Sequence, residues 1–169
     1  YARCKGIVVD TRFNRGGDLA PELVTFLSGI KLRENTNDHF RVGIEPSFRW
    51  TKPSLVLAGE ANYSDGHCFV YDYQSLRMGK LIGMPIPGSC TWMAGQSLQD
   101  PSLSYSVPVL GVKTNDGIYL ENYQTEPDIR IMNEYGPVSK GRDQQLEAAI
   151  RQSKLSAPSC IPAISPALL

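Results

Sequence analysis

Three short apolar runs, separated by spans of helical character, constrain the fold of this chain most. The runs lie within residues 5–10, 54–59 and 80–83, and their length and β-branched content are typical of buried strands. Residues 18–27 and 64–76, which lie between the runs, carry the apolar spacing of helices. Strand, helix, strand, helix and strand in this order predict an α/β domain with a parallel-rich sheet flanked by helices.

The remaining chain is expected to form a loop, a C-terminal β meander and a final helix. Residues 30–52 are polar and irregular, so we expect a surface loop there with room for one short strand. The strands of the meander are expected at residues 106–112, 118–120 and 129–131. Asp116-Gly117 is typical of a hairpin turn. Asp18 and Asp143 can cap the first and the last helix, and Gly29 can end the first.

The length of 169 residues suits one domain. Tyr1 leads almost at once into a core strand without an initial Met, so we interpret the chain as a piece of a longer protein that lacks an upstream part. We expect residues 1–155 to form the domain and residues 156–169, with three prolines, to be a disordered tail. Because the start of the longer protein is not in this sequence, the compartment is left unassigned.

Charge and cysteine content exclude several classes of function. Lys plus Arg balance Asp plus Glu at 17 each, so charge gives no reason to expect a nucleic-acid partner. No apolar run is long enough to span a bilayer. The chain has two histidines and no CxxC pair, so we expect no metal site and no cofactor. We expect thiols at the four cysteines, while a disulfide stays an alternative that sequence alone cannot pair: Cys4, Cys68, Cys90 and Cys160.

Three segments at strand ends carry residue types suited to catalysis. Asn14–Gly17 is a paired-glycine turn whose N–H groups can meet an anion, or it is an ordinary turn. Ser64 opens a helix, where the positive helix end favours negative charge at its hydroxyl and the N–H of Asp65 can meet an oxyanion. Its alternative role is that of a helix cap. Glu121 can orient a catalytic partner, or it is a solvated edge charge.

The combination and order of these segments resemble the C-terminal catalytic subdomain of tricorn core proteases, within the tail-specific and carboxyl-terminal-processing peptidases. The resemblance covers roughly residues 5–154. It implies a fold of the ClpP/crotonase type. The segments that carry it are Asp10–Gly17, Glu60–Gly66, Gly79–Gly83, Glu121-Asn122 and Glu126–Ile129.

The resemblance also implies roles for individual residues. Ser64 would be the nucleophile, and the backbone N–H groups of Gly17 and Asp65 would form the oxyanion hole. Glu121 would belong to a relay with a histidine and a second serine, both of which lie upstream of this chain in the family. Ser89 stands where the other branch of the family has its lysine base, so we expect no Ser/Lys dyad.

Neither histidine of the chain is expected to replace the upstream one, because His67 projects along its own helix and His39 lies in the variable loop. The resemblance places substrate recognition in that loop, at Asn35 and Asp38. The implied partners are a peptide or unfolded-protein substrate, the upstream subdomain and further copies in a homo-oligomer. By itself, the chain is expected to be a folded but inactive piece of a serine peptidase.

Two other functions remain open on sequence alone. One is a non-catalytic relative that binds peptides or acts as a scaffold with the same fold. The other is an acyl-CoA-handling domain of the related crotonase-like fold, in which backbone amides bind a thioester oxyanion. The Ser-Asp-Gly and Glu-Pro-Asp elements have no role in the second of these.

Overall fold

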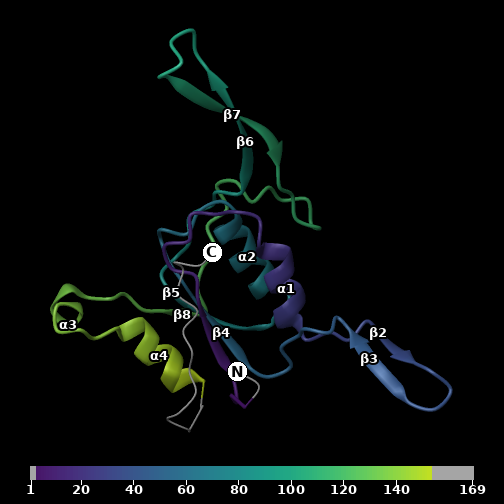
Figure 1. The fold of residues 1–169 in the computed structure, drawn as a ribbon. Helices are drawn as coiled ribbons and strands as arrows, with labels where there is room; N and C mark the ends of the chain where they lie inside the picture. Colours follow the sequence, from purple (N-terminus) through teal and green to yellow (C-terminus); the bar gives the residue numbers. More distant parts are fainter. Residues whose placement is uncertain (1–2, 154–169) are drawn as a thin grey trace.

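A four-stranded parallel sheet lies at the centre of the computed structural model, which describes residues 3–153 (Figure 1). All neighbouring strands run parallel, so their carboxyl ends meet at one edge. The strands occur in the order β1 (Ile7–Asp10), β4 (Ser54–Ala58), β5 (Gly79–Gly83) and β8 (Ile129–Arg130). The predicted α/β class is confirmed, and so are the strands that the three apolar runs predict.

The sheet is covered on both faces, because successive side chains of a strand point to opposite sides. Val56 packs into the core beneath α1 (Ala20–Ser28) and α2 (Asp65–Ser75), whereas Leu57 packs beneath α4 (Gln144–Gln152). Both side chains are fully buried. Burial of a side chain of this size stabilises the fold by about 1.5–3 kcal/mol. This two-sided burial explains why the strands are continuous apolar runs rather than alternating ones.

The last helix begins as predicted, with Asp143 as its cap. The Asp143 carboxylate accepts the Leu146 N–H at 2.9 Å and pairs with Arg12, which follows β1, at 2.7 Å. Partial burial raises the pKa of Asp143, but hydrogen bonds from Arg12, Leu146 and Asn133 outweigh that effect and lower the pKa to about 2. Asp143 therefore stays charged at neutral pH and ties α4 to the end of β1.

The first helix ends as predicted but begins differently. Gly29 adopts a left-handed conformation with φ of 65° and ends α1, where a side chain would collide with the carbonyl oxygen of Trp50. The prediction that Asp18 caps this helix is wrong, because the N-cap residue is Leu19. Instead, the carboxylate of Asp65 in α2 accepts hydrogen bonds from the first N–H groups of α1.

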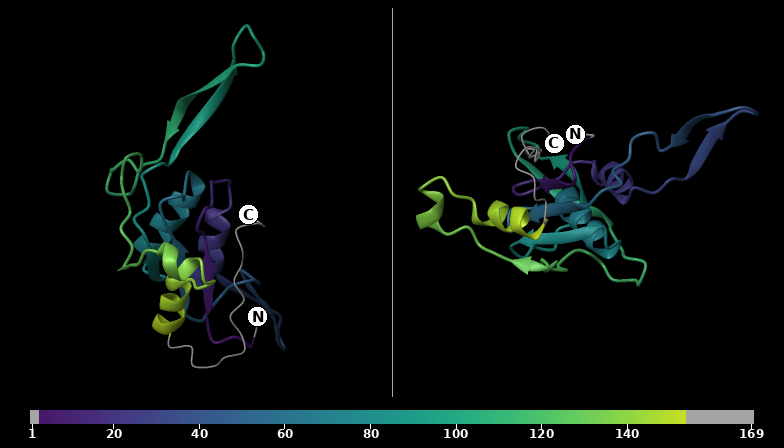
Figure 2. Two further views of the ribbon diagram at one scale, coloured as in Figure 1. Left: turned by 90° about the vertical axis from the view of Figure 1, so that its left-hand side faces the viewer. Right: turned by 90° about the horizontal axis from the view of Figure 1, so that it is seen from below.

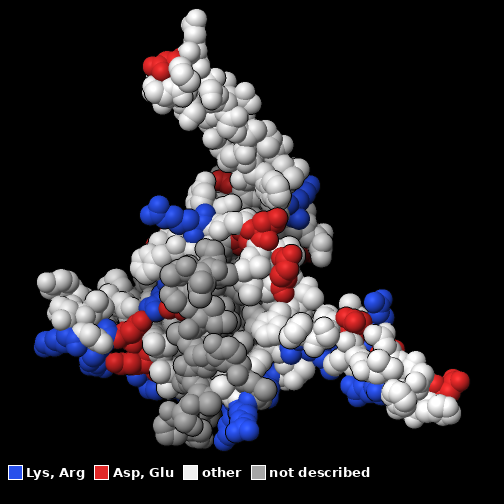
Figure 3. Space-filling view, in the orientation of Figure 1, with Lys and Arg blue, Asp and Glu red and all other residues white. Residues whose placement is uncertain are grey.

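The segment predicted as a loop at residues 30–52 contains an antiparallel hairpin of β2 (Arg33–Thr36) and β3 (Arg41–Glu45). This hairpin stands clear of the body and carries charges of both signs (Figures 2 and 3). The β2 strand is polar and exposed throughout, and the alternation of β3 is limited to Val42 and Ile44, so the pattern by which a strand is recognised in a sequence is weak here.

A second hairpin, of β6 (Thr91–Ser97) and β7 (Ser104–Gly111), projects from the other end of the molecule (Figure 1). The strand at residues 106–112 was predicted, but its partner is β6 rather than residues 118–120. A turn does form at Asp116-Gly117, flanked by a single bridge between Lys113 and Tyr119. Almost no charged side chain lies on this hairpin (Figure 3).

A short helix that the sequence did not predict, α3 (Tyr135–Val138), precedes α4. The tail predicted at residues 156–169 lies outside the described residues. Among residues 3–153, no helix is long and apolar enough to cross a membrane.

Candidate active site

Ser64 occupies a strained junction between β4 and α2. Its backbone has φ of 54° and ψ of −125°, a conformation that non-glycine residues rarely adopt. Such strain costs about 1–3 kcal/mol and is typically found at functional sites. The Ser64 side chain makes no capping hydrogen bond although the residue stands at the N-cap position. The Ser64 side chain therefore does not act as a helix cap.

The glycine turn after β1 packs directly on this serine. The Asn14 carbonyl accepts the Tyr63 N–H at 2.9 Å, and the Asn14 side chain accepts the Gly16 N–H at 2.7 Å. A Cβ atom on Gly16 would lie 2.7 Å from the Ser64 Cβ, closer than real contacts allow. Only glycine fits this position, because its φ of 106° also belongs to the region that side chains avoid.

Asp65 joins the two halves of the site through its side chain. Its Oδ2 atom accepts the N–H groups of Leu19 and Ala20, both at 2.9 Å. The carboxylate of α2 thus caps α1, a role that the sequence had suggested for Asp18. Because Gly17 comes just before the capped residues, this contact fixes the glycine turn relative to Ser64.

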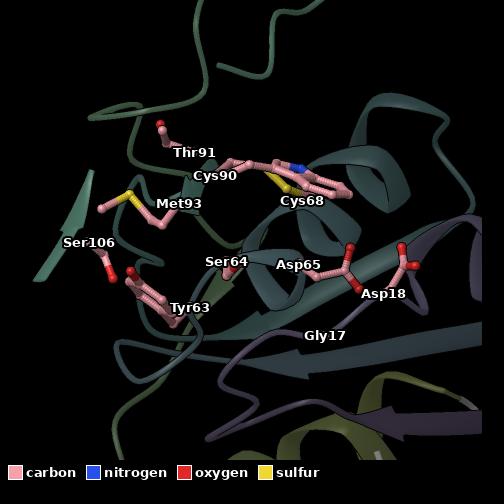
Figure 4. Close-up of a pocket in the computed structure, with 11 residues that line it drawn as sticks. Gly17, Asp18, Tyr63, Ser64, Asp65, Cys68, Cys90, Thr91, Met93 and Ser106 are labelled. Carbon is pink, nitrogen blue, oxygen red and sulfur yellow. A yellow bond between two sulfur atoms is a disulfide. The ribbon is translucent and has the colours of Figure 1, made fainter. Parts of the chain in front are cut away.

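Gly17, Ser64 and Asp65 line one cavity of about 540 Å³ (Figure 4). Figure 4 shows Ser64 between Tyr63 and Met93 on one side and Asp65 and Asp18 on the other. Within residues 3–153, neither the Gly17 N–H nor the Asp65 N–H donates a hydrogen bond to a protein acceptor. The arrangement thus combines a hydroxyl with two unused amide donors at a cavity, which is part of the set that acyl transfer requires.

Glu121 lies near this cavity but is not hydrogen-bonded to Ser64. Its Oε2 atom accepts the Cys90 N–H at 3.1 Å and the Thr91 hydroxyl at 2.6 Å. Cys90 and Thr91 line the cavity, so two residues that the sequence analysis did not select connect Glu121 to it. The Ser89 hydroxyl also accepts the Ser64 N–H, at 3.3 Å.

Cys68 and Cys90 form a disulfide, so the expectation of thiols is wrong for these two residues. Cys68 lies one helical turn after Ser64 in α2, and Cys90 immediately precedes β6. The two are 22 residues apart in sequence, and only the fold brings them together. Cys4 is buried in the core, and Cys160 lies outside the described residues.

His67 is fully buried, and its ring is hydrogen-bonded to Ser89 and Thr125 rather than to Ser64. Its Nδ1 atom accepts a long hydrogen bond from the Ser89 N–H at 3.4 Å, and its Nε2 atom is hydrogen-bonded to the Thr125 hydroxyl at 3.0 Å. Burial lowers the pKa of His67, and the negative charge of Glu121 offsets only part of that effect. Because the two ring nitrogens contact Thr125 and Ser89 rather than Ser64, His67 acts as a structural group rather than as the base for Ser64.

Burial of His67 predicts a loss of stability in mild acid. The unfolded chain takes up a proton near pH 6.5, whereas the folded His67 resists it, so the free energy of unfolding falls as the pH drops below about 6.5. The slope should reach at most about 1.4 kcal/mol per pH unit. Urea unfolding between pH 8 and 5 measures it. His67→Gln should reduce the slope of the unfolding free energy against pH. His39→Gln, on the exposed β2/β3 hairpin, should leave that slope unchanged. An equal slope in the unaltered protein and both variants would contradict the assignment of the pH dependence to His67.

Asn35 and Asp38, the predicted substrate contacts, are exposed on the β2/β3 hairpin and do not line the cavity of Ser64. Their role stays a prediction. The sequence analysis also missed Asn62, which is buried and connects Gly59, Thr11 and Gly66 beneath the site. Among residues 3–153, no group of three or more acidic, histidine or cysteine side chains is suited to hold a metal.

Comparisons with known proteins agree on one family. The model of peptidase family S41 matches residues 1–131. A tricorn protease homolog from Saccharolobus solfataricus is 31% identical over 150 residues, which cover 86% of this chain and 14% of that protein. The chain spans 12–17% of the length of the curated relatives that it matches.

Solved structures agree with the fold. The crystal structure of the tricorn protease superposes with a TM-score of 0.73 at 24% identity, covering 88% of this chain and 15% of that one. The photosystem II D1 C-terminal processing protease gives a TM-score of 0.55 at 21% identity and covers 92% of this chain and 40% of that one.

Proposed function

Because this chain belongs to peptidase family S41, we propose that it supplies the nucleophile and the oxyanion hole of a serine peptidase. The observation that carries the proposal is the strained backbone of Ser64, whose hydroxyl is not used as a cap and lies at a cavity beside two unused amides. Backbone strain of this kind clusters at active sites and ligand clamps, so it supports a functional role for Ser64.

In the proposed reaction, the Ser64 hydroxyl attacks a peptide carbonyl and forms an acyl-enzyme, which water then hydrolyses. The N–H groups of Gly17 and Asp65 hold the oxyanion, and each such donor is typically worth about 3 kcal/mol in the transition state. The positive end of α2 adds to this stabilisation, because Ser64 precedes its first turn.

The proton of Ser64 must pass to a base during the attack. Within the described residues, no histidine or lysine side chain is hydrogen-bonded to Ser64. We assign this step to a histidine of an upstream segment, with Glu121 as a member of its relay. Without that segment, the chain should not turn over peptides at a useful rate. The substrate of the complete protein would be a peptide or an unfolded protein, and further copies are its proposed assembly partners.

A fluorophosphonate probe tests this proposal, because it reacts only with an activated serine. We expect an adduct at Ser64, located by mass spectrometry, in the full protein and at least about tenfold less in the chain alone. Ser64→Ala should abolish the adduct. Labelling in neither protein would contradict the proposal and favour a non-catalytic, peptide-binding relative of the same fold.

A further inference from the structure

The Cys68–Cys90 disulfide connects two parts of the site. Cys68 belongs to α2, the helix that Ser64 precedes, and Cys90 belongs to the segment that holds Glu121. Both cysteines line the cavity. The disulfide therefore lines the site itself and is not distant from it.

The segment of Ser89, Cys90 and Thr91 orients Glu121. The Cys90 N–H and the Thr91 hydroxyl both donate to the same carboxylate oxygen, Oε2. The Glu121 side chain is otherwise exposed, and an exposed glutamate has considerable rotamer freedom. The position of this carboxylate thus depends on where Cys90 and Thr91 stand.

Hydrogen bonds between this segment and α2 are weak. The Ser64 N–H lies 3.3 Å from the Ser89 hydroxyl, and the Ser89 N–H lies 3.4 Å from the Nδ1 atom of His67. Both distances exceed the usual range of about 2.7–3.2 Å. The β6/β7 hairpin starts at Thr91 and stands clear of the body, so a displacement of the hairpin would act directly on this segment (Figure 2).

We propose that the Cys68–Cys90 disulfide positions Glu121 relative to Ser64, so that the site is fully active only while the bridge is oxidised. The proposal rests on the proposed peptidase function. Cys90 and Cys68 are positioning residues here, since they act through Glu121 and through α2.

A dithiol reductant would open the bridge. One thiolate of the reductant attacks the sulfur of Cys68, which is half-buried at the cavity, whereas Cys90 is only 2% exposed. The disulfide bond breaks, a mixed disulfide forms, and the second thiolate of the reductant releases Cys68. The reductant leaves as its own disulfide, and the two cysteines take up two electrons and two protons.

The test compares the oxidised full protein, the dithiol-treated full protein and the double variant Cys68→Ser/Cys90→Ser, well below their melting temperatures. We expect kcat on a short peptide to fall about tenfold to a hundredfold in both altered forms, with KM within about threefold. The double variant should not respond to the dithiol. Unchanged kcat in the reduced protein, with thiol labelling showing that the bridge is open, would overturn the proposal.

A second measurement separates positioning from general stabilisation. In a Glu121→Gln background, removal of the bridge should cost little further activity, because both changes act on the same group. Equal losses in the two backgrounds would mean that the bridge is only structural, and would overturn the proposal. Thr91→Val, with the bridge intact, should give part of the same kcat loss.

Fluorophosphonate labelling distinguishes failure of the two proposals. An unlabelled Ser64 in the oxidised protein refutes the peptidase function. A labelled Ser64 with additive activity losses refutes only the role of the bridge.

Discussion

Exchange of Ser64 for alanine should lower kcat/KM of the full protein on a peptide substrate by about 10⁴-fold or more. The magnitude follows from serine peptidases in general, where removal of the nucleophile leaves only binding and oxyanion stabilisation. The Ser64 side chain makes no capping hydrogen bond, so its loss should change the free energy of unfolding by less than about 0.5 kcal/mol. Steady-state kinetics and urea unfolding of the same samples measure both quantities.

Ser75→Ala is the matched control for this experiment. Ser75 is exposed at the end of the same helix and takes no part in the cavity, so its exchange should leave both activity and stability unchanged. A Ser64→Ala protein that keeps more than about a tenth of the activity would show that another group performs the attack.

Alanine at Gly16 is expected to damage activity more than stability. The new Cβ atom would lie 2.7 Å from the Ser64 Cβ and 3.1 Å from its Oγ, and the φ of 106° is unfavourable for alanine. Relief of this clash must displace the serine or the turn, and a shift near 1 Å lowers catalysis about 10²-fold. We expect a stability loss of about 1–3 kcal/mol alongside it. Activity, fluorophosphonate labelling rate and urea unfolding would be measured together.

Gly43→Ala controls for the general effect of a glycine exchange. Gly43 lies in β3, its φ is not positive, and an added Cβ atom would meet nothing within 4 Å. Its exchange should leave the labelling rate of Ser64 unchanged. If Gly16→Ala labelled as fast as the unaltered protein, the tight contact between the glycine turn and the nucleophile would have no part in the reaction.

The parts of the fold that could be predicted are those whose signal lies within a short stretch of sequence. The buried strands β1, β4 and β5 are apolar runs that only a two-sided sheet can accommodate, so their sequence signal is strong. The β2/β3 hairpin has a weak signal, because its Arg-Glu-Asn-Thr strand is exposed throughout and β3 alternates only at Val42 and Ile44. The partner of β7 was missed because β6, Thr-Trp-Met-Ala-Gly-Gln-Ser, does not alternate between polar and apolar residues as β7 does.

The candidate site, like the fold, could be predicted only in part. Short segments placed Gly17, Ser64 and Asp65 at strand ends, and the parallel sheet brings those ends to one cavity. The hydrogen bonds of Glu121 and the Cys68–Cys90 pairing join segments more than 20 residues apart, which no local pattern encodes.

The double use of Asp65 limits how this domain can evolve or be engineered. Its side chain caps the start of the first helix, and its main-chain amide belongs to the proposed oxyanion hole. Asparagine can keep the capping contacts through its carbonyl oxygen, whereas alanine or lysine removes them and loosens the turn that carries Gly17. Selection for thermal tolerance and selection for turnover would therefore favour the same few residues at this position.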